Sequence, residues 1–167
     1  MFSVKPAILL ILLAIITLSS KGQTSAGIGI YPTGTETGVG FRSGKNSKWM
    51  LDARIAKANF YSNTALSSFT TEASAICRVI SLEKLRFHIG IGARTEWNFG
   101  GKKDKWGGVI PVGVEAFPFP FQNAGLIFEI APFFTQDIDN SYYAGLRTVA
   151  GFVFYFPVKE KAKEIKN

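Results

Sequence analysis

The sequence predicts an all-β protein, namely a closed, antiparallel, up-and-down transmembrane β-barrel of about eight strands. Three observations lead to this prediction. Charged and apolar side chains alternate residue by residue along several stretches, and successive side chains of a strand point to opposite faces. Turn-type residues separate many of these stretches, and none has a convincing helical period. The chain also begins with a segment typical of exported proteins.

The 167 residues divide into three predicted parts. Residues 1–22 are expected to be a secretory signal peptide, because a short basic start precedes the apolar run from Ala7 to Leu18. The alternative, a membrane anchor, is disfavoured because a spanning helix needs about 20 apolar residues. Residues 23–156 are expected to form an outer-membrane barrel, and residues 157–167 a charged periplasmic tail.

Eight segments have strand-like patterns, and turn-type residues such as Gly, Pro, Asn, Asp and Ser separate several of them. Eight antiparallel strands are enough to close a small barrel. The predicted strands are residues 25–31, 36–43, 48–60, 70–81, 85–97, 107–117, 124–135 and 142–156.

The connections between these segments alternate in length, which also favours a barrel in the outer membrane. Those after the second, fourth and sixth strands are short, whereas those after the third, fifth and seventh are mostly longer. Outer-membrane barrels have short periplasmic turns and longer extracellular loops. The connection after the first strand, residues 32–35, is short and does not fit this asymmetry.

The polar face of the predicted strands carries long charged side chains instead of a soluble protein's mixed surface. Between residues 86 and 97, one face reads Arg, His, Gly, Gly, Arg, Glu and the other Phe, Ile, Ile, Ala, Thr, Trp. All six arginines lie opposite the apolar face in this way. The predicted lumen network contains Arg42, Asp52, Arg54, Glu72, Arg78, Arg86, His88, Arg94, Glu96, Glu115, Glu129 and Arg147.

Such a set predicts a barrel interior filled by paired charges. Buried charges are costly unless they are paired and hydrogen-bonded, and an eight-stranded barrel is just wide enough for side chains to fill it. Glycines on the same face, including Gly40 and Gly92, are expected to leave room for arginine side chains. The alternative is a narrow ion path or a substrate site, which the near balance of charge disfavours.

Aromatic residues gather near both predicted ends of the strands, as expected for interfacial girdles. The predicted girdle residues are Trp49, Trp97, Trp106, Phe117, Tyr142, Tyr143, Tyr155 and Phe156.

Other classes of protein fit the sequence less well. The net charge of +7 comes mainly from lysines in the signal, turns and tail, so we expect no nucleic-acid binding. A single cysteine, Cys77, excludes an internal disulfide. The sequence contains no metal-ligand cluster and no phosphate-binding glycine loop, so no metal or other cofactor is expected. His88 is the only histidine, and a hydrogen-bonding role in the network is favoured over catalysis.

The opening GIGIYPTGTETGVGFRSG, the following KWMLDARI and the closing aromatic strand GFVFYF resemble small eight-stranded outer-membrane barrels, the porin-like OmpA/OmpX-type family abundant in Bacteroidota. The resemblance covers residues 23–156 as a pattern and includes no catalytic motif. It implies location in the cell outer membrane of a Gram-negative bacterium, contact with its lipid and insertion by the barrel assembly machinery. One departure is the lysine- and glutamate-rich segment after the last aromatic residue.

The favoured function is therefore non-enzymatic: a monomeric outer-membrane barrel with a structural or surface-interaction role. A narrow porin-like channel is the alternative. A lipid A-modifying enzyme that uses His88 is a third, less favoured, possibility, and a soluble exported barrel with an apolar interior is a fourth.

Overall fold

A computed structural model of the chain describes residues 25–33, 36–58, 68–99, 101–120 and 123–156. The predicted signal peptide and the predicted tail lie outside these residues. Within the described part, the regular structure consists of β-strands, and no helix is long and apolar enough to cross a membrane.

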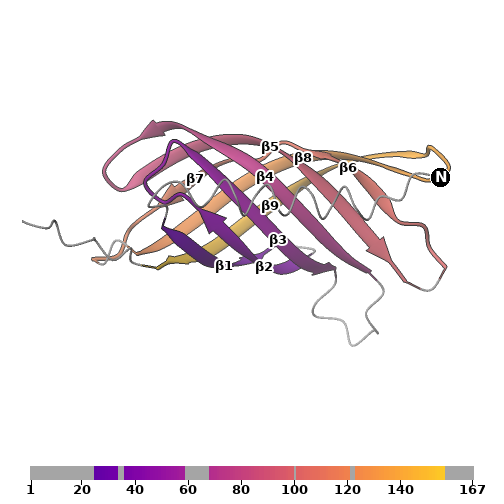
Figure 1. The fold of residues 1–167 in the computed structure, drawn as a ribbon, viewed down its shortest axis with the longest axis horizontal. Coiled ribbons are helices and arrows are strands. Elements are labelled where there is room, and N and C mark those ends of the chain that lie inside the picture. The colour runs from indigo at the N-terminus through magenta and orange to yellow at the C-terminus, as the bar shows by residue number, and fades with distance from the viewer. Residues whose placement is uncertain (1–24, 34–35, 59–67, 100, 121–122, 157–167) are drawn as a thin grey trace, which may run out of the picture.

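Nine strands tilt around a common axis (Figure 1). Their bounds agree closely with the predicted segments, because alternating apolar and polar residues and separating turn residues are strong local signals. The strands are β1 (Ala26–Pro32), β2 (Glu36–Ser43), β3 (Trp49–Ala58), β4 (Ser68–Ser81), β5 (Leu85–Asn98), β6 (Lys105–Val109), β7 (Val112–Ala116), β8 (Ala124–Asp137) and β9 (Tyr142–Tyr155).

The strands form one closed antiparallel ring. Consecutive strands from β1 to β5 pair with one another, β8 pairs with β9, and β9 pairs with β1. β6 and β7 do not pair with each other, and both lie between β5 and β8. Because β6 and β7 share one position, the nine strands occupy eight positions around the ring. The prediction of a closed, up-and-down barrel of about eight strands is confirmed.

The predicted sixth strand is interrupted where β6 ends and β7 begins. Pro111 has no N–H to donate to a neighbouring strand. Its carbonyl still accepts from Gly90 N–H at 2.8 Å, and Ile110 N–H donates to the Pro132 carbonyl at 3.0 Å. The backbone therefore stays in place in the ring, and the single predicted strand appears as two short ones.

The two ends of the barrel differ. At the turn end lie the connections 44–48 and 82–84 and the described residues 117–120 and 123, together with the start of β1 and the end of β9. At the loop end lie the ends of β1, β3, β5 and β8 and the starts of β2, β4, β6 and β9. Gly44 in the first turn has a φ of 76°, a conformation that glycine adopts without the strain that a side chain would add.

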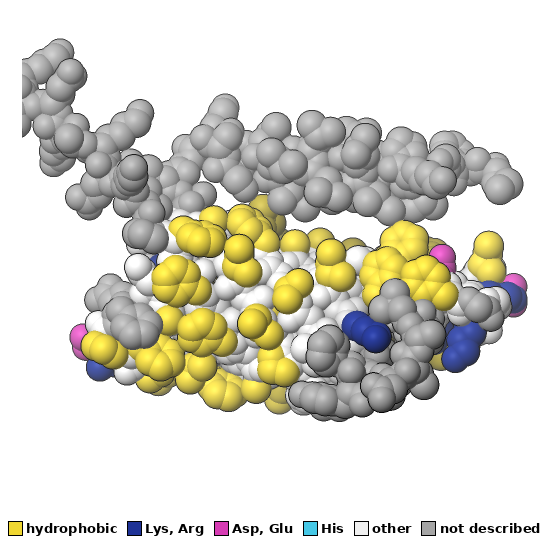
Figure 2. Space-filling model, turned by 90° about the horizontal axis from the view of Figure 1, so that it is seen from below, with side chains coloured by type: hydrophobic (Ala, Val, Ile, Leu, Met, Phe, Trp, Pro, Cys, Tyr) yellow, Lys and Arg dark blue, Asp and Glu magenta, His cyan; other side chains and the backbone are white. Residues whose placement is uncertain are grey.

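Apolar side chains cover the outside of the barrel between these ends. Figure 2 shows hydrophobic side chains spread over the middle of one face, with charged side chains toward the ends. The exposed residues recur at every second position, as Ile28 and Ile30 in β1 and Phe152 and Phe154 in β9 illustrate. The belt also includes Val39, Phe41, Ile55, Ile89, Ile91, Val112, Phe128, Ile130 and Leu146.

The interior contains charged residues and, toward the turn end, an apolar cluster. The cluster consists of Tyr31, Phe117, Ile127, Val149, Val153 and Tyr155. Phe117 and Tyr155 were predicted to belong to the aromatic girdle, and for these two residues the prediction was wrong. Both share the parity of inward-facing neighbours, Glu115 and Val153, and they are 5% and 0% exposed. Strand alternation therefore directs them into the barrel.

Candidate functional site

The candidate site is the charged interior, and strand register assembles it. In the β2–β3 ladder Arg42 lies opposite Asp52. In the next two ladders Glu72 lies opposite Arg54 on one side and Arg94 on the other. Because these positions share a face, the register places charges of opposite sign beside one another inside the barrel.

The middle of the interior is organised around Arg54 and Arg42. The guanidinium of Arg54 donates from Nη1 and Nη2 to the Glu129 carboxylate at 2.9 and 2.8 Å. Its Nε donates to Asp52 at 2.6 Å. Arg42 donates to the same Asp52 from Nε at 2.5 Å, and its Nη2 lies 3.7 Å from Glu129. Two arginines thus share two carboxylates, which suits the planar, multidentate guanidinium.

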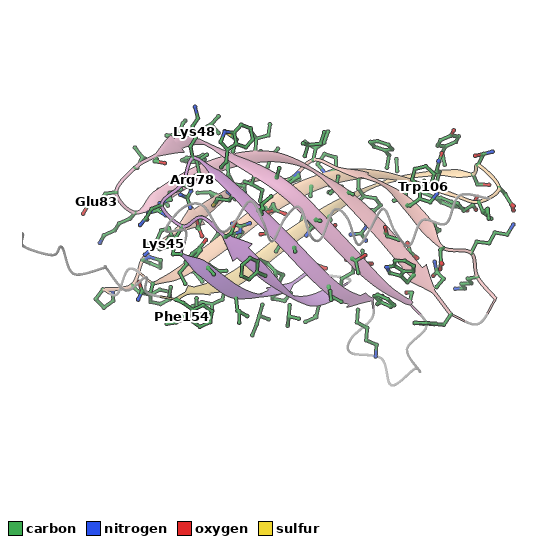
Figure 3. The ribbon with its side chains drawn as sticks, viewed as in Figure 1. Lys45, Lys48, Arg78, Glu83, Trp106 and Phe154 are labelled. Atoms are coloured by element: carbon green, nitrogen blue, oxygen red, sulfur yellow. The ribbon has the colours of Figure 1, made fainter. Side chains whose placement is uncertain are left out.

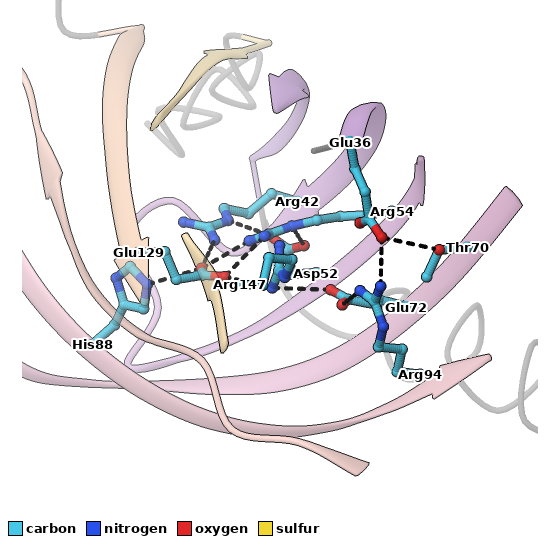
Figure 4. A network of polar contacts seen from close by, with 10 residues as sticks. All are labelled: Glu36, Arg42, Asp52, Arg54, Thr70, Glu72, His88, Arg94, Glu129 and Arg147. Carbon is cyan, nitrogen blue, oxygen red and sulfur yellow. Dashed lines mark hydrogen bonds and ion pairs between the residues drawn. The ribbon is translucent and has the colours of Figure 1, made fainter. Parts of the chain in front are cut away.

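Toward the loop end, Arg94 and Arg147 continue the same chain of contacts. Arg94 donates to Glu72 at 2.7 Å and to Glu36 at 2.6 Å. Arg147 Nη2 lies 3.0 Å from Glu72 and 2.9 Å from Glu129. Arg147 therefore joins the two halves into one continuous cluster, which Figure 4 shows in close-up.

We call these eight residues the central network: Glu36, Arg42, Asp52, Arg54, Glu72, Arg94, Glu129 and Arg147. Four guanidinium groups face four carboxylates, so the network is neutral. All of these residues except Glu36 are buried. Each buried charge has an oppositely charged neighbour, which is the arrangement that a low-dielectric interior requires.

Glu36 is the one member of the central network that the predicted lumen set lacks. It stands at the start of β2 and shares the parity of Arg42. The two-residue alternation of β2 therefore predicts that the Glu36 side chain faces the interior, and the sequence alone could have identified it. Besides Arg94, it accepts a hydrogen bond from Thr70 Oγ1 at 3.4 Å.

His88 lies at the edge of the central network. Its Nε2 is 3.4 Å from a Glu129 oxygen, and the residue is 1% exposed. A side chain at Gly113, which pairs with both His88 and Glu129, would approach His88 Nε2 to 3.0 Å. Gly113 therefore leaves the space in which the histidine and the carboxylate meet.

Besides His88, four residues of the predicted lumen set lie outside the central network. Arg78, Arg86 and Glu115 are inside the barrel, near the turn end. Glu96 has no ion pair with an arginine among the described residues. Its carboxylate lies 3.7 Å from Lys105 Nζ, and its side chain is 29% exposed. Glu96 keeps the inward parity of Arg94, but it lies where β5 reaches the loop end, and there it is half-buried and pairs with Lys105 instead of an arginine.

Glycines on the inner face leave room for tyrosine rings as well as for arginines. A Cβ at Gly29 or Gly151 would collide with the Tyr31 ring, and one at Gly27 would collide with Tyr155. The Arg54 guanidinium lies 4.3 Å from the Tyr31 ring centroid, within the range of a cation–π contact. The inner-face glycines were predicted to leave room for arginine side chains, and in the structure they also leave room for the tyrosine rings.

At the loop end, a small pocket reaches the central network. It has room for about one water molecule. Its charged lining, Glu36, Arg54, Glu72, Arg94 and Arg147, is already paired within the network. No group of three or more His, Cys, Asp or Glu side chains among the described residues could hold a metal ion.

Of the other predicted girdle residues, all but Tyr143 lie on the outer face of the barrel, near its two ends. Tyr143 shares the parity of Arg147, and its ring lies beneath Lys105 Nζ at 4.3 Å, so for this residue the girdle prediction was wrong. Trp49 and Phe156 are exposed at the turn end. At the loop end, Trp106, Tyr142 and Tyr143 are exposed. Trp97 is half-buried: its ring stacks on Phe69 with 5.9 Å between the centroids, and its Nε1 donates to Thr71 at 3.0 Å.

Comparison with solved structures supports the fold. The chain is similar to Neisserial surface protein A (NspA), with a TM-score of 0.52 and 13% identity over 80% of this chain and 96% of that one. It is more distantly similar to Ail, the attachment invasion locus protein of Yersinia pestis, with a TM-score of 0.38 and 13% identity over 79% and 96%. No protein-family model and no curated protein matches the sequence.

Proposed function

We propose that this protein is a monomeric, non-enzymatic barrel of the bacterial outer membrane whose neutral central network is a structural scaffold. The regions that contact other molecules are the outer surface and the connections at the loop end. Signal-directed export and insertion by the barrel assembly machinery deliver it there, and outer-membrane lipid covers its apolar belt.

One observation carries this proposal: the polarity of the barrel is inverted. Large apolar side chains such as Ile30 and Ile130 are 55% and 54% exposed, whereas Arg42 is fully buried. In water an exposed apolar belt of this extent would favour aggregation. In lipid it is the preferred arrangement, because the outward side chains meet hydrocarbon and the closed ring satisfies the backbone.

The filled interior favours a scaffold over the alternative function, a channel. The apolar cluster toward the turn end and the central network above it occupy the lumen, and their charges are paired. An ion crossing this interior would have to break several buried ion pairs. The similarity to a protein named for its surface location also supports a surface role.

The location is tested by membrane fractionation combined with heat-modifiable migration in gels. We expect the protein in the outer-membrane fraction, and we expect the unheated protein to migrate differently from the boiled protein because a closed barrel resists detergent. A protein recovered in the periplasm, with one migration at both temperatures, would overturn the proposal.

Two further measurements test the competing functions. In planar lipid bilayers we expect no conductance, and defined unitary steps would favour the channel. A strain with His88→Ala is expected to keep an unchanged lipid A profile, because His88 is buried against Glu129. Loss of a lipid A modification in that strain would favour the enzyme.

A further inference from the structure

A cluster of three cations occupies the interior at the turn end. Lys45 comes from the turn after β2, Arg78 from β4 and Arg86 from β5. Figure 3 shows Lys45 and Arg78 at the end of the barrel opposite Trp106. We call these three residues the basic cluster. Lys45 and Arg78 are only 8% and 7% exposed.

The hydrogen bonds of the two arginines go mainly to neutral atoms. Arg86 Nη1 donates to the Lys45 carbonyl at 2.6 Å. Arg78 Nη1 donates to the Ser47 carbonyl at 2.7 Å, and its Nη2 contacts Met50 Sδ at 2.9 Å. These bonds hold the guanidinium groups in position without neutralising them. The central network is different, because there each arginine is bonded to carboxylates.

The carboxylate next to this cluster, Glu115, does not balance it. One Glu115 oxygen lies 3.7 Å from Arg78 Nη2, and the other accepts a hydrogen bond from the Tyr155 hydroxyl. Three cations and one carboxylate leave a net charge of +2 at the turn end of the described interior. Lys48, Glu83 and Lys84 belong to the same end but are exposed to solvent.

Two further observations indicate that this cluster is incomplete. Arg78 Nε is buried and has no hydrogen-bond partner among the described residues; Arg94 Nε and Arg147 Nε in the central network share this property, so the orphaned donor counts here only together with the excess positive charge. The pKa of Lys45 is lowered, first by burial and then by the nearby charge of Arg86. A buried donor without an acceptor and a lysine destabilised by neighbouring cations are both relieved by an added anion.

We propose that the turn-end mouth of the barrel binds a phosphate-class anion between Lys45, Arg78 and Arg86. Guanidinium groups match the geometry of phosphate oxygens, and charge-assisted bonds of this type are among the strongest available. The Phe117 ring forms one wall, since the Arg86 guanidinium lies 4.5 Å from its centroid and Lys45 Nζ 5.5 Å. The anion is either free phosphate or the headgroup of a phospholipid with a net negative charge, and only the second source rests on the proposed membrane location.

The test uses the full mature chain, folded in a zwitterionic detergent. Inorganic phosphate is titrated at constant ionic strength with chloride as the replaced anion, and the urea midpoint of unfolding is recorded. A ligand that binds only the folded state raises this midpoint. We expect phosphate to raise it. Arg86→Gln, which is half-buried, should weaken the apparent phosphate affinity about tenfold, the effect of losing one charge-assisted bond.

Matched variants separate a specific site from general charge. Lys48→Gln removes an exposed lysine in the same turn as Lys45, three residues away. Lys48→Gln should bind phosphate like the wild type, whereas Lys45→Gln should not. Glu115→Gln should bind more tightly, because it removes the one negative charge beside the cluster. Equal phosphate effects in Lys48→Gln, Arg86→Gln and the wild type, or no effect in any, would overturn the proposal.

A second arm identifies the source of the anion. The same unfolding experiment is repeated in phosphatidylcholine vesicles with and without phosphatidylglycerol. An Arg86-dependent increase in stability with phosphatidylglycerol supports a headgroup, and one with inorganic phosphate alone supports a soluble anion. No Arg86-dependent effect in either arm overturns the site. Heat-modifiable migration of the same samples reports separately on the barrel, so failure of the site and of the proposed function are distinguishable.

Discussion

At the scale of single residues, the interior depends on arginines that each serve more than one carboxylate. Arg54 contacts Asp52 and Glu129, and Arg147 contacts Glu72 and Glu129. The net stabilisation from a buried pair is small, since desolvation opposes the Coulomb attraction. Removing one partner has a large effect, because the charge left behind stays buried without compensation.

Arg54→Met should therefore destabilise the barrel by about 3–5 kcal/mol, the cost of breaking a buried ion pair. The free energy of unfolding, measured by urea titration in lipid vesicles, checks this value. Arg54→Lys is the matched control: it keeps the charge but lacks the planar fork, so an intermediate loss is expected. A Met variant as stable as the wild type would show that the central network does not support the fold.

At the scale of strands, alternation and close packing between ladders position the site. Gly113 in β7 lies between His88 and Glu129 in the two neighbouring strands. A Cβ there would collide with the Phe128 carbonyl oxygen and approach His88 Nε2 to 3.0 Å. His88 therefore contacts Glu129 for two reasons: β7 lies between their strands, and Gly113 has no side chain to separate them.

Gly113→Ala should destabilise the barrel by about 1–3 kcal/mol, the usual cost of overpacking. Gly125→Ala in β8 is the control, because a Cβ there meets its nearest atom, in the Phe117 ring, at 3.2 Å. Urea unfolding of both variants under the same conditions measures the difference. Equal stability of the two variants would contradict the argument from close packing.

At the scale of the whole molecule, the barrel combines an apolar outside with a closed, charged inside. The ring leaves no free strand edge among the described strands, so the backbone can be satisfied without water. Figure 2 shows the hydrophobic belt from one side. The environment of this belt can be tested with a single charge placed at two different heights.

Ile130→Lys places a cation in the middle of β8, on the outer face, where Ile130 is 54% exposed. If lipid surrounds the belt, this variant should lose about 2–4 kcal/mol, as expected for lysine near the bilayer midplane. Ile138→Lys, just beyond the end of β8 and 80% exposed in the native chain, should lose little. Folding titrations in vesicles measure both, and equal losses would argue against a membrane belt.

Strand positions and the parity of most interior charges could be predicted from the sequence, because they depend on local alternation. The same alternation also predicts the inward direction of two residues that were assigned wrongly or omitted. Glu36 shares the parity of Arg42, and Tyr155 shares that of Val153. The girdle prediction weighed aromatic character near strand ends above parity. Parity proved decisive, because a strand cannot turn one side chain outward without turning its neighbours inward.

The sequence by itself determined the class of fold, the inward direction of the arginines and the outward direction of the apolar residues, since each follows from a two-residue period. Only the tertiary structure decided which charges meet. Arg54 bonds to Glu129, 75 positions away, and Arg78, Arg86 and Lys45 gather beside one carboxylate. Pairing across the ring depends on register and on ring closure, and these are properties of the assembled barrel that no local pattern encodes.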